Sequence, residues 1–188
     1  MKRLLQWLTA VVLVMLAGPS GATAQSAKFG LGGGLVVPTS DYNTIDKTGW
    51  HVLGKVDFGI PMSPIGVRVD AMYGQTSHKD QGGVAVPGNT KLAGGTAGVV
   101  WHIPTAVPGF KPYLLASGGV YNFKQTFPSS PGTSEVSETK FTWGAGVGVT
   151  IGVGPVHGFV EGRYMSIQTS ATAVKFIPLT VGVTFGSK

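Results

Sequence analysis

Glu161 and Arg163 stand two residues apart in the stretch VHGFVEGRY, which runs from Val156 to Tyr164. On a β-strand, side chains two residues apart point to the same face, so this carboxylate and this guanidinium would lie together. Such a pair could act in proton transfer, or it could be an ion pair that neutralises two buried charges. The charge pattern of the other segments distinguishes these two uses.

The same spacing of opposite charges recurs at two other places, where Lys55 precedes Asp57 and Arg68 precedes Asp70. The six residues carry three positive and three negative charges, and they are Lys55, Asp57, Arg68, Asp70, Glu161 and Arg163. A narrow interior requires such balance, because an unpaired buried charge is costly while a paired one is tolerated. The pattern predicts a structural charge network in the lumen of a barrel, not a catalytic pair.

The four histidines do not complete a catalytic or metal site. His51, His102 and His157 share the inward parity of the charges but lie on different segments. His78 stands beside Lys79 in a polar stretch, which predicts a solvated loop. A small lipid-modifying enzyme, the alternative, would need a Ser, a His and an acid together on the outer face of one rim. The sequence therefore predicts no enzymatic activity, no catalytic residue and no cofactor or metal site.

Composition favours strands over helices. The chain has 188 residues, of which 30 are glycine and only 12% are charged. Glycine in a helix interior costs roughly 1 kcal/mol relative to alanine, so this content disfavours a helical protein. The absence of cysteine excludes disulfides, thiol nucleophiles and cysteine metal ligands. Basic residues are scattered without a run, which gives no support to nucleic-acid binding.

The first 24 residues have the three parts of a cleavable signal peptide. Lys2 and Arg3 are basic, Leu4 to Leu16 is apolar, and Ala22 to Ala24 offers a small-residue cleavage site. The apolar run is shorter than the ~20 residues that span a bilayer, which disfavours a retained anchor. The sequence predicts an exported protein with a signal peptide over residues 1–24 and one barrel domain over residues 25–188.

Segments of about ten residues must position these charges and histidines. Along each segment, apolar residues alternate with polar or small ones with a period of two. There are eight of them: Lys28 to Val37, Trp50 to Ile60, Gly66 to Gln75, Lys91 to Ile103, Lys111 to Phe123, Lys140 to Gly152, Val156 to Ile167 and Phe176 to Gly186. Long polar connections, at residues 38–49, 76–90, 124–139 and 168–175, alternate with shorter Pro/Gly turns. This pattern predicts an all-β fold, an eight-stranded antiparallel up-and-down transmembrane β-barrel.

The two faces of the segments differ in polarity. In the sixth segment, Phe141, Trp143 and Val147 share one face, and Thr142 and Gly144 share the other. A membrane barrel turns the apolar face to lipid, whereas a soluble exported lipocalin-like barrel, another alternative, would reverse the two faces. Glycine and threonine dominate the polar face, where a soluble surface would carry lysine and glutamate, so the membrane barrel is favoured.

Aromatic residues gather near the segment ends, as in the two interfacial girdles of a membrane barrel. The predicted interface aromatics are Trp50, Phe58, Tyr73, Trp101, Trp143, Tyr164 and Phe185, and Phe29, Tyr113, Tyr121 and Phe141 follow the same pattern. The segment length also suits a bilayer, which requires about ten residues of a tilted strand.

Three stretches carry a resemblance to a known family: KPYLLASGGVY at Lys111 to Tyr121, VEGRY at Val160 to Tyr164 and IPLTVGVTF at Ile177 to Phe185. With the signal peptide, they make the chain similar to the small OmpX/OmpA-like outer-membrane β-barrel proteins, the outer membrane protein beta-barrel domain group. The resemblance implies a monomer in the cell outer membrane, surrounded by outer-membrane lipid and inserted by the barrel-assembly machinery. Members usually end on an aromatic residue, whereas here Phe185 is followed by Gly-Ser-Lys.

The predicted role is structural or one of surface interaction. Eight strands enclose a space about wide enough for side chains alone, so we expect a closed polar lumen and no pore. Binding usually resides in loops on a rigid scaffold, so a surface partner would bind through loops 38–49, 76–90, 124–139 and 168–175. The composition of these loops does not identify the partner.

Overall fold

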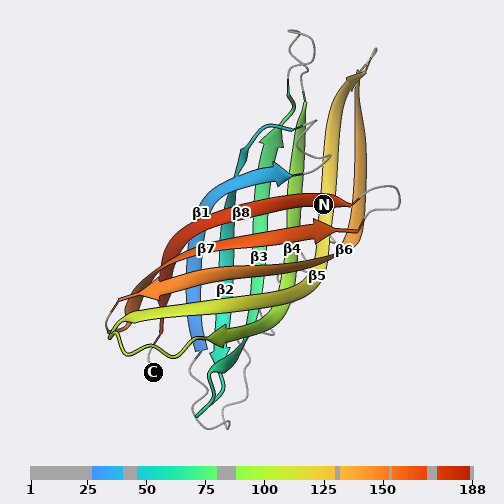
Figure 1. Cartoon of the computed structure of the whole chain (residues 1–188). Coiled ribbons are helices and arrows are strands. Elements are labelled where there is room, and N and C mark those ends of the chain that lie inside the picture. The colour runs from blue at the N-terminus through green and yellow to red at the C-terminus, as the bar shows by residue number, and fades with distance from the viewer. Residues whose placement is uncertain are drawn as a thin grey trace.

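The structure, a computed structural model, describes residues 27–39, 46–79, 88–129, 132–152, 154–168 and 173–186. Each strand pairs antiparallel with its neighbours in the chain, and β1 pairs with β8 to close one barrel (Figure 1). The strands are β1 (Ala27–Thr39), β2 (Gly49–Gly59), β3 (Ile65–Ser77), β4 (Asn89–His102), β5 (Phe110–Ser129), β6 (Gly132–Ile151), β7 (Val156–Ile167) and β8 (Val174–Phe185). The predicted eight-stranded up-and-down fold is confirmed, and the predicted signal peptide lies outside the described residues.

Alternation along each strand sets which side chains point outward. On β3, Val67 is 42% exposed on the exterior, whereas Arg68 beside it is 2% exposed in the interior. On β6, Phe141 is exposed and Thr142 is fully buried. The exterior is therefore apolar and the interior holds the buried charges, so the soluble alternative with reversed faces is wrong.

The two ends of the barrel differ in their connections. We call one end the turn side, with connections at residues 60–64, 103–109 and 152–155, and the other the loop side, with connections at residues 40–48, 78–88, 130–131 and 168–173. In two of the turns, Gly109 (φ 75°) and Gly154 (φ 88°) adopt a left-handed backbone conformation that favours glycine. No helix in the described part of the chain is long and apolar enough to span a membrane.

The hairpin of β5 and β6 is longer than the sequence predicted. Each strand has 20 residues, and their pairing continues to Ser129 opposite Gly132. The predicted bounds of loop 124–139 are therefore wrong, because only residues 130–131 connect the two strands, which run on together at the upper right of Figure 1. Each strand supplies the backbone hydrogen-bond partners of the other. The Ser-, Thr- and Pro-rich sequence of this part did not indicate such pairing. The other predicted loops also lose residues to strand ends, at 38–39, 49, 76–77, 89–90 and 174–175.

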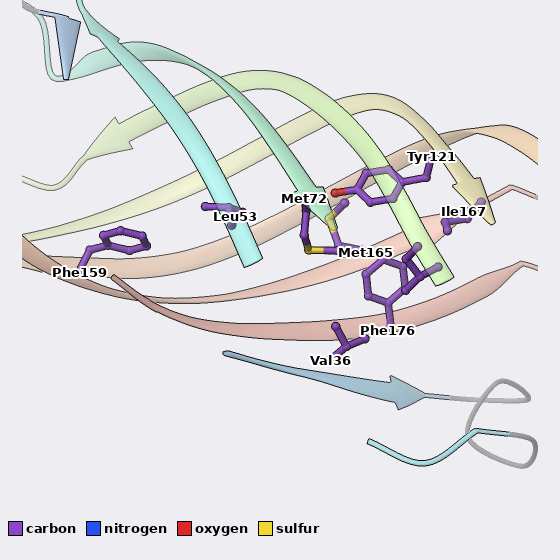
Figure 2. Close-up of a cluster of buried hydrophobic side chains, with 9 residues drawn as sticks. Val36, Leu53, Met72, Tyr121, Phe159, Met165, Ile167 and Phe176 are labelled. Atoms are coloured by element: carbon purple, nitrogen blue, oxygen red, sulfur yellow. The ribbon is translucent and has the colours of Figure 1, made fainter. Parts of the chain in front are cut away.

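Apolar side chains, most of them near the loop-side ends of their strands, fill part of the interior (Figure 2). We call them the apolar cluster, and its buried members are Val36, Leu53, Met72, Leu92, Tyr121, Phe159, Met165, Ile167 and Phe176. The rings of Tyr121 and Phe176 meet edge to face with centroids 6.4 Å apart. Leu53, which interrupts the polar face of its segment in the sequence, is buried here as a member of this cluster.

Candidate functional site

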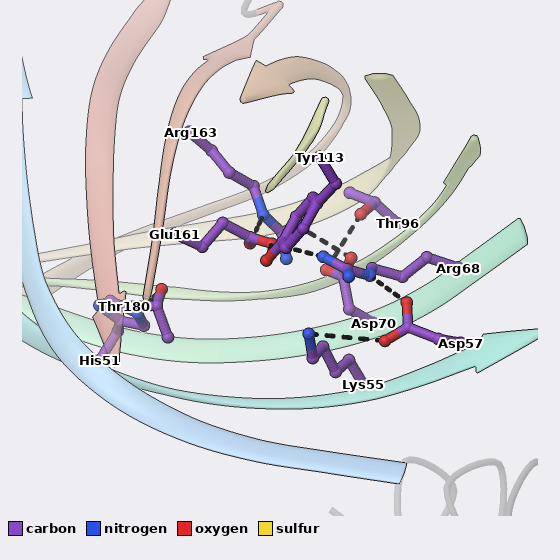
Figure 3. Close-up of polar contacts among 10 residues, drawn as sticks. All are labelled: His51, Lys55, Asp57, Arg68, Asp70, Thr96, Tyr113, Glu161, Arg163 and Thr180. Carbon is purple, nitrogen blue, oxygen red and sulfur yellow. Dashed lines mark hydrogen bonds and ion pairs between the residues drawn. The ribbon is translucent and has the colours of Figure 1, made fainter. Parts of the chain in front are cut away.

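The six charged residues singled out in the sequence meet in one group inside the barrel, which we call the ion network (Figure 3). They come from three strands, and they are Lys55 and Asp57 on β2, Arg68 and Asp70 on β3, and Glu161 and Arg163 on β7. Ion pairs join them into one chain of alternating sign, in the order Lys55, Asp57, Arg68, Glu161, Arg163 and Asp70. The network is therefore neutral as a whole, and each charge has an opposite neighbour.

Glu161 lies at the centre of the ion network and is 1% exposed. Arg68 Nη1 donates to its Oε2, and Arg163 Nε donates to its Oε1. Tyr113 Oη, which comes from β5, also donates to Oε2 at 2.6 Å. Both carboxylate oxygens are occupied, and the two guanidinium groups stabilise a charge that burial alone would disfavour.

Asp70 forms one end of the ion network. Its Oδ2 accepts a hydrogen bond from Arg163 Nη1 at 2.9 Å, and its Oδ1 accepts one from the Thr96 hydroxyl at 3.0 Å. A single side chain of β7 thus ties Glu161 to a carboxylate of β3 through two different nitrogens, which the planar fork of a guanidinium allows.

Lys55 and Asp57 form the other end of the ion network. Asp57 Oδ1 accepts from Arg68 Nε at 2.5 Å, and Lys55 Nζ lies 3.5 Å from Asp57 Oδ2. The Lys55 ammonium also lies 3.7 Å from the centroid of the Phe159 ring, a cation–π distance. Phe159 belongs to the apolar cluster, so this contact joins the two groups that fill the lumen.

Strand register brings the members of the ion network together. Across β2 and β3, Lys55 lies opposite Asp70 and Asp57 lies opposite Arg68. The pair on β7 reaches them from elsewhere in the barrel wall, and Glu161 is 93 residues from Arg68 in the chain. The two-residue spacing in the sequence indicates the shared face of each pair, but not that the three pairs join across the lumen.

Tyr113 and Thr96 contribute to the site and were missed by sequence reasoning. Tyr113 is 1% exposed, and its ring also lies 5.0 Å from the guanidinium carbon of Arg68. The nearest atoms to a methyl group built on Gly148, the residue opposite on β6, belong to the Tyr113 ring. Glycine opposite a tyrosine is the signal that could have identified an inward-pointing ring.

The seven predicted interface aromatics lie on the exterior near both ends of the barrel. On the loop side, Trp50 packs against Tyr73 and Trp143 against Tyr164, each pair with ring centroids 5.8 Å apart. The turn-side members are Phe58, Trp101 and Phe185, of which the last two are 47% and 44% exposed. Their place at a membrane interface stays a prediction. The placement of Tyr113 and Tyr121 with this group is wrong, because both rings are buried in the lumen.

The inward histidines do not form one group: His102 and His157 line the turn-side end of the lumen, whereas His51 does not. His51 Nε2 is 2.8 Å from Thr180 Oγ1, a buried hydrogen bond between β2 and β8. The prediction that His78 is solvated is wrong: it is 4% exposed, and its Nε2 lies 3.5 Å from Asp46 Oδ1. Asp46 also accepts from the Thr76 hydroxyl at 2.6 Å, so a carboxylate that was expected in a loop covers this histidine from the loop side.

The arrangement is suited to holding the barrel wall together. A general acid or base must reach a substrate, whereas the carboxylate of Glu161 is enclosed and already accepts from three donors. Within the part of the chain that the structure describes, no three His, Asp or Glu side chains gather as a metal site. The chemistry of this group is mutual neutralisation of charge in a confined space.

The sequence profile described as "Outer membrane protein beta-barrel domain" matches residues 8–185 of the chain. Among curated proteins, none matches the chain.

Solved outer-membrane barrels have the same fold at low sequence identity. Neisserial surface protein A is 18% identical with a TM-score of 0.64, covering 86% of this chain and 97% of its own. Ail, the attachment invasion locus protein of Yersinia pestis, is 20% identical with a TM-score of 0.62, covering 87% of this chain and 100% of its own. The N-terminal barrel domain of Pseudomonas aeruginosa OprF is 16% identical with a TM-score of 0.51, covering 87% and 98%. At these identities the likeness shows the fold alone.

Proposed function

Because the chain belongs to the outer membrane protein beta-barrel domain family, we propose that it is a monomeric barrel of the outer membrane that binds a partner through its loop side. Residues 1–24 act as the signal peptide that directs export. The turn side faces the periplasm and the loop side faces the outside, because the two longest connections, 40–48 and 78–88, and the extended β5–β6 hairpin lie on the loop side, as the longer extracellular connections do in other outer-membrane barrels.

The observation that carries the binding role is the β5–β6 hairpin. Among the described residues, β6 pairs with β7 from Thr142 onward and Phe141 O accepts from Gln168 N, so Gly132–Lys140 has β5 on one side and no described strand on the other. An unpaired strand edge is a template for a strand of another chain, because its N–H and C=O groups lack partners. The hairpin therefore presents a ready edge to a partner protein outside the cell.

The filled lumen supports a binding role over transport. The ion network, the apolar cluster and Tyr113 occupy the interior between them, and their large side chains, such as Arg68, Tyr113 and Phe176, are 2% exposed or less. An eight-stranded barrel has room for little besides such side chains. A conducting path would require the ion pairs of Glu161 to open.

The chain is not an enzyme in this proposal. The lipid-modifying alternative requires a histidine on the exterior, whereas His51 and His78 are both buried.

One structurally similar protein suggests which partners to test. Ail, named for attachment and invasion, was solved in complex with sucrose octasulfate, a heparin analogue.

The test uses bacteria that display the chain and measures their attachment to a mammalian cell monolayer and to immobilised heparin. In the key variant, residues 125–136 are replaced by Asn-Gly, so that Lys124 and Ser137, which are paired in the structure, flank a two-residue turn. We expect attachment to the monolayer to fall to the level of cells without the chain. A matched variant lacking residues 81–86 controls for a shortened loop-side connection.

Two measurements accompany the attachment assay. Outer-membrane fractionation, with gel mobility before and after heating, must show the unaltered chain and both variants as folded outer-membrane barrels. Attachment that is unchanged without the hairpin contradicts the proposed binding role. Loss of attachment to heparin alone would assign the hairpin to a polyanion instead of a protein strand. Labelling of the folded chain by a serine-reactive probe would favour the enzyme alternative.

A further inference from the structure

A cavity of about 80 Å³ lies inside the turn-side mouth of the barrel, below the ion network. Lys28 on β1 and Lys111 on β5 both line it. In the closed order of eight strands, β1 and β5 stand four positions apart, so these two lysines approach the cavity from opposite walls. His102 on β4 and His157 on β7 also line it, which adds two ring systems that can donate hydrogen bonds.

The charge of this cavity is positive. Asp57 is the one carboxylate among the described residues that line it, and it is bound to Arg68 and lies 3.5 Å from Lys55. Since the ion network is neutral as a whole, Lys28 and Lys111 add a formal charge of +2 beyond it. A confined space with this charge attracts anions and disfavours cations.

Hydroxyl groups complete the wall. Thr184 lines the cavity from β8 and is 4% exposed, and its Oγ1 is buried without a hydrogen-bond partner among the described residues. A buried hydroxyl without a partner is costly, so it indicates a group that occupies the cavity. Thr150 adds a second hydroxyl from β6. The cavity thus offers ammonium groups and hydroxyls that converge from different strands, as a recognised anion requires.

We propose that this cavity binds a tetrahedral oxyanion, a phosphate or sulfate group, between Lys28, Lys111 and Thr184. The volume exceeds the roughly 10–15 Å³ that one water requires, so it accommodates several waters or one such ion. Lysine ammonium groups bind phosphate as point charges, and the threonine hydroxyl donates to an anionic oxygen. The group can arrive as a free ion or as the headgroup of a phosphomonoester lipid. That this mouth faces the periplasm rests on the proposed orientation, but the binding itself does not.

The test is isothermal titration calorimetry on the full folded barrel in octyl glucoside, at constant ionic strength. One titration uses inorganic phosphate and another uses short-chain phosphatidic acid, which separates a free ion from a lipid headgroup. We expect saturable binding of one stoichiometric anion to the unaltered protein. Lys111→Gln should weaken it by about tenfold and Lys28→Gln/Lys111→Gln by about a hundredfold, because each variant removes a charged donor.

Two further comparisons separate a built site from general attraction to a basic protein. Thr184→Val should weaken binding by about threefold, while Thr184→Ser, which keeps the hydroxyl, should restore it. Lys91→Gln/Lys140→Gln removes the same charge from the loop side and should leave the affinity unchanged. Heat-dependent gel mobility confirms that each variant is folded. Failure of both probes to bind, or equal affinity in the Lys28/Lys111 double variant, overturns the proposal.

Discussion

The ion network and the apolar cluster fill the same lumen by different means, and β7 runs through both. Glu161 and Arg163 belong to the ion network, whereas Met165 and Ile167, further along the same strand, belong to the apolar cluster. In the network, each group depends on the position of particular nitrogen and oxygen atoms. In the cluster, the side chains have only to fill volume. On this one strand, we expect side-chain substitutions in the ion network to be poorly tolerated. Substitutions by apolar side chains of similar size in the apolar cluster should be tolerated.

The difference follows from the cost of burying polar groups. A buried charge without its partner is strongly unfavourable, while a displaced methyl group loses only contact area. Exchanges in the network should therefore cost more free energy of unfolding than exchanges of equal size in the cluster. The predictions below run from the largest expected effect to the smallest.

Glu161→Gln should have the largest effect. The exchange leaves two guanidinium groups facing a neutral amide, and we expect the free energy of unfolding to fall by about 3–5 kcal/mol. The double variant Glu161→Gln/Arg163→Met removes one charge of each sign, so the remaining network stays neutral as a whole, although Asp70 loses its ion pair with Arg163 and keeps its hydrogen bond from Thr96. It should therefore lose less than the single variant. Urea unfolding of the barrel in lipid vesicles, followed by tryptophan fluorescence, measures both.

The control for this prediction lies outside the lumen. Glu138 pairs with Lys140 at 3.5 Å on the β5–β6 hairpin, and its side chain is 44% exposed. Glu138→Gln should change the free energy of unfolding by less than about 0.5 kcal/mol. A single Glu161 variant that is more stable than the double variant would contradict the assignment of Glu161 as the centre of the network.

Arg163→Lys should have an intermediate effect, although it keeps the charge. The guanidinium donates to Glu161 through Nε and to Asp70 through Nη1, and an ammonium cannot reproduce this fork. We expect a loss of about 2 kcal/mol in the same unfolding assay. Lys140→Arg, the reverse exchange at an exposed pair, serves as the control. Full stability of the Arg163→Lys barrel would show that charge alone, without geometry, maintains the network.

Among the single exchanges inside the lumen, Met165→Leu should have the smallest effect. Met165 is 1% exposed in the apolar cluster, two residues from Arg163 on the same face of β7. The exchange conserves volume and introduces no polar group, so the expected loss is less than about 1.5 kcal/mol. The comparison is sharpest when both β7 variants are measured together. If Met165→Leu cost as much as Arg163→Lys, the two regions would not differ in the way described above.

The parts that the sequence predicted well are those where polarity alternates without ambiguity. The charged pairs on β2, β3 and β7 identify the inward face of each strand, because a charged side chain that faces lipid is energetically unfavourable. The shared face of Glu161 and Arg163 follows from that alternation, and the eight-stranded barrel follows from eight alternating segments joined by long and short connections in turn. The sequence does not predict that the three pairs join into one network, since this depends on register between strands that are distant in the chain.

The parts that the sequence did not predict are those where both faces look alike. The β5 segment KPYLLASGGVY carries apolar or small residues at every position after Lys111, so alternation could not show that Tyr113 and Tyr121 point inward. Residues 124–129 and 132–139 look like a loop in the sequence, because Ser, Thr and Pro are common in turns, yet they extend a hairpin. His78 was expected to be solvated because its neighbours in sequence are polar, whereas its burial comes from Asp46.

The separation between Glu161 and Arg68 has a consequence for the order of assembly. The two residues are 93 positions apart, and the acid reaches the arginine only once β7 has joined the sheet. Before that step, Arg68 lacks one of its two carboxylate partners, so a sheet of the first six strands is a poor stopping point in a membrane. Long-range contacts of this kind form late and slowly. The network therefore couples the last hairpin to the first ones and makes the completion of the barrel a cooperative event, in which the final strands and the internal charges reach their places together.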